Sequence, residues 1–216
     1  MELTQKEIKL KFGKKISFNE KLSNYSWFNL GGPSEIFFKP DNIEDIVFLL
    51  KNFKPKKITI LGAGSNTLIR DGGVEGITIK LSSHFSYLNL LSENIIEVGA
   101  ATLDKKIANF ALENSLTGLE FLSCIPGSIG GAIRINSGCY GQDISQILYS
   151  VKVLDIYGHE KNISASDIKF NYRDSNLDKS LIITSVKLQG KDSVKEKIQN
   201  KQQKLIIKKK NLNQVK

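Results

Sequence analysis

The chain has 216 residues, of which 40% are hydrophobic, and this is enough for one substantial core or for two small subdomains that share a ligand. No apolar run approaches the roughly 20 residues of a membrane span, and Met1–Lys15 lacks the apolar stretch of a secretory signal, so we expect a cytoplasmic protein without a membrane partner. The formal charge is +9, but Lys191–Lys216 carries +7 and Met1–Lys15 carries +3, which leaves the body nearly neutral and argues against a nucleic-acid partner.

The first half of the chain predicts several strands around one helix. A helix is expected from about Ile43 to Phe53, because Asp41 followed three residues later by Glu44 marks a helix start. The run Lys57–Leu61 is β-branched and apolar, as a buried strand should be, and it stops at Gly62. Further strands are expected at Glu35–Lys39, Ile77–Leu81 and Asn94–Val98, with a turn at Gly72, Gly73 and Gly76.

The second half predicts a helix capped by Thr102 that runs to about Ser115, since its apolar residues fall on one face at helical spacing. A glycine-rich segment follows from Gly118 to Gly141. After it we expect a hairpin, a closing strand and a weakly amphipathic helix, at Val151–Ile156 with Lys161–Ile163, at Leu181–Leu188 and from Ser193 onward. Because this order does not alternate strand and helix regularly, the sequence predicts an α+β fold and not a Rossmann domain.

Cysteine, histidine and lysine residues suggest no additional chemistry. Cys124 and Cys139 are interpreted as small structural thiols beside tight turns. His84 and His159 lie in unrelated segments, so no metal site is predicted. The lysine-rich end is interpreted as a solvated helix or a frayed end.

The first glycine loop, Gly62–Asn66, follows the strand expected at Lys57–Leu61. Glycines at a strand end allow backbone amides to approach a phosphate, and Ser65 and Asn66 add side-chain donors. A tight strand-ending turn without a ligand would look similar. Thr67 stands where a dinucleotide fingerprint needs a third small residue, which argues against a nicotinamide-binding Rossmann unit.

The second glycine loop, Pro126–Ala132, belongs to a segment in which glycines alternate with apolar residues. This pattern indicates a backbone packed closely against something flat or phosphorylated. An ordinary glycine-rich crossover at a domain seam is the alternative. Two such loops in one short domain favour a large, extended cofactor.

Taken together, the segments resemble the family of UDP-N-acetylenolpyruvoylglucosamine reductases, also called UDP-N-acetylmuramate dehydrogenases, of bacterial peptidoglycan synthesis. The resemblance spans roughly Tyr25 to Leu188 and rests on Trp27–Gly32, Gly62–Asn66, Gly118–Phe121, Ile125–Gly131 and Tyr172–Arg173. It implies an FAD-binding domain of the vanillyl-alcohol oxidase (PCMH) type, with two small α+β subdomains. The corresponding boundaries are an N-terminal extension at 1–20, the FAD-binding domain at 21–190 and a basic helical connector at 191–216.

The resemblance also implies which residues hold the cofactor. It assigns the pyrophosphate to Gly62, Ala63, Gly64, Ser65, Asn66 and Thr67. It assigns the rest of the FAD to Pro126, Gly127, Ser128, Gly130, Gly131 and Ala132. Because no histidine lies in or beside either loop, we expect the FAD to be bound without a covalent link.

In the family, NADPH supplies a hydride that passes through FAD to the enolpyruvyl double bond of UDP-N-acetylglucosamine enolpyruvate. By motif match the catalytic arginine is Arg173, whose guanidinium can grip a carboxylate, and Tyr172 is expected to shape the substrate pocket. Without the resemblance, Arg173 would be interpreted as a surface ion-pair residue.

The family continues beyond Leu188 into a substrate-binding domain that supplies a proton-donating serine and a glutamate. Neither role is assigned to a residue of this chain, which we expect to be a fragment with FAD binding partly retained and turnover lost. Alternatives are a shortened flavin-binding relative, another FAD oxidoreductase of the same fold, and a non-enzymatic binding module that uses the basic tail. The oligomeric state is not predicted.

Overall fold

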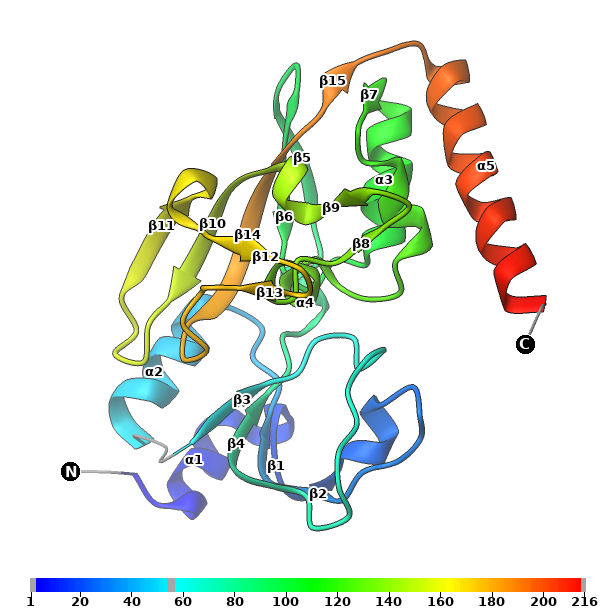
Figure 1. Cartoon of the computed structure of the whole chain (residues 1–216). Helices are drawn as coiled ribbons and strands as arrows, with labels where there is room; N and C mark the ends of the chain where they lie inside the picture. Colours follow the sequence, from blue (N-terminus) through cyan, green and yellow to red (C-terminus); the bar gives the residue numbers. More distant parts are fainter. Residues whose placement is uncertain (1–2, 54–56, 215–216) are drawn as a thin grey trace.

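The computed structural model describes residues 3–53 and 57–214 and contains two stacked α+β halves, each built on its own sheet (Figure 1). This arrangement confirms the predicted α+β fold. Within the described residues, no helix combines the length and the apolar character that a membrane span requires. The same residues contain no group of three or more histidine, cysteine, aspartate or glutamate side chains that could hold a metal ion.

The lower half in Figure 1 is a four-stranded sheet with two helices packed on it. Strand order is β1-β2-β4-β3, in which β1 is antiparallel to β2 and the other neighbours are parallel. Buried side chains of α1 and α2 pack against those of β2 and β4. The bounds are α1 Gln5–Phe12, β1 Ile16–Lys21, β2 Pro33–Phe38, α2 Ile43–Phe53, β3 Ile58–Ile60 and β4 Val74–Ile79.

Residues expected to form an N-terminal extension contribute to this half. β1 pairs with β2 along its whole length, and Ile8 and Ile16 are fully buried in the same core. Charged and apolar residues alternate here because α1 and β1 each present one face to the core and the other to solvent.

Three local expectations for this half are wrong. Asn42, and not Asp41, marks the start of α2: the Asn42 Oδ1 accepts from the amide of Asp45 at 2.8 Å, whereas Asp41 pairs with Lys15. β3 is half-buried and not buried, because it is an edge strand. Gly76 lies within β4 and not in a turn, and its φ of +74° suits a strand irregularity.

The upper half is a five-stranded antiparallel sheet in the order β11-β10-β14-β6-β5, with α3 and α4 against one face. Its core joins Val98, Val151 and Val186 of the sheet to Ile107 and Ile133 of the two helices. The bounds are β5 Leu88–Ser92, β6 Ile95–Gly99, α3 Asp104–Glu113, α4 Ile129–Arg134, β10 Leu148–Leu154, β11 Glu160–Ser164 and β14 Ile182–Gln189. Short pairs complete this half: β7 Leu116–Thr117 with β15 Lys191–Asp192, β8 Gly138–Cys139 with β9 Gln142–Asp143, and β12 Phe170–Asn171 with β13 Asp174–Ser175.

The hairpin β10–β11 confirms the prediction, but two other expectations for the upper half are wrong. β14 is the central strand and not a closing one, which explains why its side chains are buried on both faces. Thr102 does not cap α3; Leu103 is the capping residue, and the Thr102 hydroxyl donates to the carbonyl oxygen of Tyr87.

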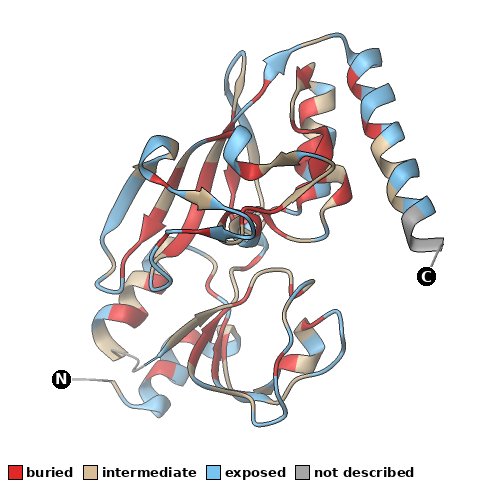
Figure 2. Ribbon diagram, in the orientation of Figure 1, coloured by how far each residue is buried: buried red, intermediate tan, exposed pale blue. Residues whose placement is uncertain are grey.

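The lysine-rich helix α5 (Lys195–Gln214) is docked along one side and does not fray from the body. It lies beside α3 and the 3-10 helix η4 (Glu120–Cys124), and buried positions recur along it in Figure 2. Lys201 pairs with Glu120 at 3.0 Å, and the Lys209 Nζ donates to the carbonyl oxygen of Cys124 at 2.8 Å. The expectation of a wholly solvated end is therefore wrong for the inner face of α5.

Candidate functional site

Three parallel strands of the lower sheet end at the same edge, facing the upper half. β2 and β4 are in register at Phe38 and Ile79, so Lys39 and Lys80 follow side by side. β3 ends next to them and leads through Leu61 into the first glycine loop. The carboxyl ends of parallel strands are a common location for ligand sites in α/β proteins.

At this edge the two glycine loops meet, although they are separated by about sixty residues in sequence. The Ser65 hydroxyl donates to the carbonyl oxygen of Pro126 at 2.7 Å. A Cβ placed on Gly62 would lie 3.0 Å from the Ser128 Oγ. The structure thus brings the two predicted loops into direct contact.

The first glycine loop is held from behind by the segment that precedes β2. The amide of Trp27 donates to the carbonyl oxygen of Gly64 at 3.0 Å, and the Ser26 hydroxyl donates to that of Thr67 at 3.2 Å. Gly64 has a φ of +72°, and a Cβ there would lie 1.9 Å from the Tyr25 carbonyl oxygen. Only glycine fits this position.

Several backbone amides in both loops have no hydrogen-bond acceptor among the described residues. Among the described residues, no acceptor pairs with the amides of Gly62–Asn66 or with those of Gly127 and Ser128. Unpaired amides at a tight turn form a typical anion-binding cradle. A Cβ on Gly131 would meet no atom within 4 Å, so the second loop also leaves open space for a ligand.

A cavity of about 490 Å³ lies between the halves and reaches both loops. This volume is in the range of small-molecule and cofactor sites. Within the described part of the chain, its lining includes four cationic side chains, those of Lys39, Lys80, Arg134 and Lys179, and no acidic one. Although the body of the chain is nearly neutral, the lining of this cavity is positively charged, which suits an anionic ligand.

Lys80 contacts the first glycine loop directly. Its Nζ donates to the carbonyl oxygen of Gly62 and so fixes the start of the first loop. Burial lowers the pKa of Lys80, and the nearby charge of Lys39 lowers it further. An anion placed between the two ammonium groups would relieve this repulsion.

Arg134, at the end of α4, ties the second loop to the segment before β14. Its guanidinium donates to the carbonyl oxygens of Leu177 at 3.2 Å, Asp178 at 2.7 Å and Leu181. Burial lowers the pKa of Arg134, while the charge of Asp178 opposes this effect. These contacts hold Lys179 at the cavity.

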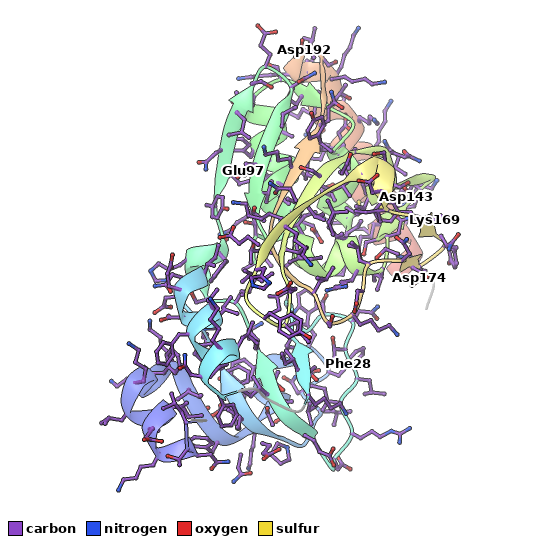
Figure 3. All side chains as sticks on the ribbon, turned by 90° about the vertical axis from the view of Figure 1, so that its left-hand side faces the viewer. Phe28, Glu97, Asp143, Lys169, Asp174 and Asp192 are labelled. Carbon is purple, nitrogen blue, oxygen red and sulfur yellow. The ribbon has the colours of Figure 1, made fainter. Side chains whose placement is uncertain are left out.

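Tyr172 and Arg173 form the turn of the β12–β13 hairpin and do not line the cavity. Tyr172 is 91% exposed, and Arg173 has a φ of +59°. The Arg173 Nη2 donates to the carbonyl oxygen of Gly138 at 3.4 Å. The Asn136 Nδ2 donates to the carbonyl oxygen of Asn171 at 3.2 Å. Figure 3 shows neighbouring Asp174 on the upper half, above Phe28 of the lower half.

The sequence-predicted cofactor residues fall into two groups. Gly62, Ala63, Ser128, Gly130 and Gly131 line the cavity. The others are not among the lining residues: Ser65 and Pro126 join the loops, Gly127 lies against Asp104, and Ala132 is buried in the upper core, while Gly64, Asn66 and Thr67 complete the first loop.

Sequence reasoning missed the cationic lining and the serines beside it at Ser82, Ser83 and Ser86. A signal was present, because Lys39 and Lys80 each follow an apolar strand segment directly. Parallel pairing of these strands was needed to place them together.

Comparisons with known proteins agree with this geometry. Residues 34–164 match the family described as FAD binding domain. A curated UDP-N-acetylenolpyruvoylglucosamine reductase of Pelagibacter ubique is 44% identical over 187 residues, which cover 86% of this chain and 62% of that protein. One of Orientia tsutsugamushi strain Ikeda is 44% identical over 189 residues, which cover 84% of this chain and 62% of that protein. The crystal structure of UDP-N-acetylenolpyruvylglucosamine reductase from Thermus caldophilus matches with a TM-score of 0.79 and 28% identity over 90% of this chain and 68% of that one. The chain thus spans about 62% of the length of these curated relatives.

Proposed function

Because the chain belongs to the FAD binding domain family and is homologous to UDP-N-acetylenolpyruvoylglucosamine reductases, we propose that it holds FAD for the reduction of a UDP-linked enolpyruvyl sugar. The observation that carries the proposal is the cationic cavity bounded by two glycine loops with unpaired amides. Residues 21–190 would hold the cofactor, with β15 and α5 packed beside them.

The residues present fit a non-covalent FAD. The amides of Gly62–Asn66, Gly127 and Ser128 would face the two phosphates, and Lys39 and Lys80 would balance their charge. Bound flavin supplies two-electron hydride chemistry. The loops fix its position, and the surrounding apolar residues, such as Ile60 and Leu81, reduce the access of water.

For the substrate, we propose UDP-N-acetylglucosamine enolpyruvate, with NADPH as the hydride donor and UDP-N-acetylmuramate as the product. Negative charge develops on the carboxylate of the enolpyruvyl group when hydride is added to its double bond. Arg173 would bind that carboxylate, and the exposed ring of Tyr172 would contact the sugar beside it. Both residues are exposed at the hairpin turn, so a substrate could reach their side chains from solvent.

A non-enzymatic module that uses the basic tail is less well supported. Lys201, Lys208 and Lys209 of α5 already contact Glu120, the Tyr140 ring and the Cys124 carbonyl oxygen within the chain. We therefore propose that nucleic acid and membrane are not partners. NADPH and nucleotide sugars are cytoplasmic metabolites, so a cytoplasmic location is part of the proposal.

The direct test is the visible absorption spectrum of the purified chain after incubation with FAD and removal of free cofactor. We expect flavin bands, and a change in those bands when the UDP-enolpyruvyl sugar is added. A colourless protein that takes up no FAD would remove the proposal. Flavin bands that do not respond to the sugar would favour another FAD oxidoreductase of the same fold.

A further inference from the structure

The carboxyl group of Asp104 is buried at the start of α3, directly behind the second glycine loop. Asp104 is 0% exposed, and its amide donates to the carbonyl oxygen of Gly127 at 3.1 Å. A Cβ placed on Gly127 would lie 3.2 Å from Asp104 Oδ2 and 3.5 Å from Ser65 Oγ. The carboxyl group therefore lies where the two glycine loops meet.

Neither carboxylate oxygen of Asp104 has a hydrogen-bond partner among the described residues. A buried ionised carboxylate without a partner is very unfavourable, so the group keeps its proton. Burial raises the pKa of Asp104 to about 8. Among the side chains that the structure describes, the carboxyl oxygens of Asp104 are the only buried oxygens without a partner.

Charged groups on the elements packed around Asp104 are already paired or exposed. Glu120 of η4 is held by Lys201 of α5, and Lys105 and Lys106 on α3 itself are exposed. The first glycine loop presents the uncharged Ser65. Of the three lysines that line the cavity, Lys39, Lys80 and Lys179, burial lowers the pKa of Lys80, so the proton of Lys80 also bears on an anionic ligand.

We propose that Asp104 is a positioning residue of the FAD site, and that its carboxyl group must carry a proton for the second glycine loop to hold the phosphates of FAD. When neutral, it leaves the amides of Gly127 and Ser128 free for a phosphate. When ionised, it attracts these amides toward itself and repels the phosphates. The inference rests on the proposed cofactor site. It adds that the Asp104 carboxyl group is protonated in the FAD complex, so that an ionised Asp104 takes up a proton when FAD binds.

This linkage has a defined consequence for the affinity. The dissociation constant for FAD is nearly independent of pH below about pH 7 and rises by up to about tenfold per pH unit above the pKa of Asp104. Lys80 acts in the same direction when it loses its proton. Substitution Lys80→Arg keeps the positive charge across this range and removes that contribution.

The experiment measures FAD binding by the full chain with Lys80→Arg, using calorimetry at pH 8 in two buffers with different ionisation enthalpies. We expect net uptake of a fraction of a proton per FAD bound, and a dissociation constant that rises about tenfold or more from pH 7 to pH 9. No proton uptake, with FAD bound, would overturn the inference while leaving the cofactor assignment intact. No FAD binding at any pH would overturn both.

A second pair of variants assigns the proton to Asp104. In the Lys80→Arg background, Asp104→Asn should remove both the uptake and the pH dependence, whereas Asp192→Asn, at an exposed aspartate of β15, should change neither. An unchanged pH dependence in folded Asp104→Asn would overturn the inference. Circular dichroism reports whether Asp104→Asn is folded. If it is not, the proton uptake measured by calorimetry of the Lys80→Arg variant in the two buffers tests the inference.

Discussion

The hydroxyl of Ser65 donates a 2.7 Å hydrogen bond to the carbonyl oxygen of Pro126 and so joins the two glycine loops. Ser65 belongs to the lower half and Pro126 to the upper half, so this contact sets the spacing of the loops across the cavity. In the proposed function both loops hold one extended cofactor, so their spacing would bear directly on its affinity.

Substitution Ser65→Ala should weaken FAD binding by about twofold to tenfold, as expected for one lost hydrogen bond. Fluorescence quenching of added FAD measures this. Ser166→Ala is the matched control, because the Ser166 hydroxyl contacts only Ser164 and Asp167 on the surface. Equal affinities for the two variants would show that the Ser65–Pro126 contact does not position the loops.

Substitution Lys80→Met should lower FAD affinity by about tenfold or more and reduce its dependence on salt, since one cation no longer faces the phosphates. The stability of the protein without FAD should stay the same or rise, because a half-buried cation beside Lys39 is removed. Titrations with FAD at two salt concentrations and urea unfolding measure the two effects. Lys197→Met, at an exposed lysine of α5, should change neither.

Three glycine variants separate the fold from the site. Gly64→Val should prevent folding of the first loop, because its Cβ would lie 1.9 Å from the Tyr25 carbonyl oxygen at a φ of +72°. Gly131→Val should fold normally but lose FAD binding, because its side chain extends into the cavity. Gly72→Ala should change neither folding nor FAD binding, because its Cβ also meets no atom within 4 Å and Gly72 does not line the cavity. Full FAD affinity in Gly131→Val would place the cofactor elsewhere.

The stability of the protein without FAD should fall between about pH 4 and pH 8 because of Asp104. The unfolded chain releases this proton near the ordinary pKa of 3.8, whereas the folded chain keeps it until about pH 8. The folded state therefore binds more protons in this interval, and its free energy of unfolding falls by up to about 1.4 kcal/mol per pH unit. Urea unfolding of Asp104→Asn should show a smaller decline than the unchanged chain, and Asp192→Asn should match the unchanged chain.

Lys201→Met should destabilise the docking of α5. Glu120 is 2% exposed; burial alone would raise its pKa, but hydrogen bonds from Thr117 and Lys201 outweigh burial and hold the pKa below its usual range. Loss of the Lys201 partner should cost about 1–3 kcal/mol. The stability from Glu120 is present at neutral pH and is lost as the pH falls through its lowered pKa, so Lys201→Met should flatten the acid limb of a pH titration. Thermal unfolding from pH 3 to 7 measures this, with Lys197→Met as the control.

Much of the fold follows from local pattern. Local signals predict the helix at Ile43–Phe53 and the hairpin of Val151–Ile156 with Lys161–Ile163, because side-chain periodicity and turn residues act within a few positions. The position of a strand within its sheet is not predicted by local pattern. Leu181–Leu188 reads as a strand in sequence, but its central position depends on pairing with β6 and β10, far away in the chain.

The glycine loops and the family resemblance can be read from the order of residues, because a glycine that must adopt a positive φ or approach another backbone, as Gly64 does, leaves a local pattern. The charge and the proton state of the site arise only on folding. Lys39 and Lys80 become a pair only when β2 and β4 align in parallel, and Asp104 keeps its proton only when folding buries it behind the second loop. Electrostatic energy depends on distance and burial in space, which the order of residues along a chain does not contain.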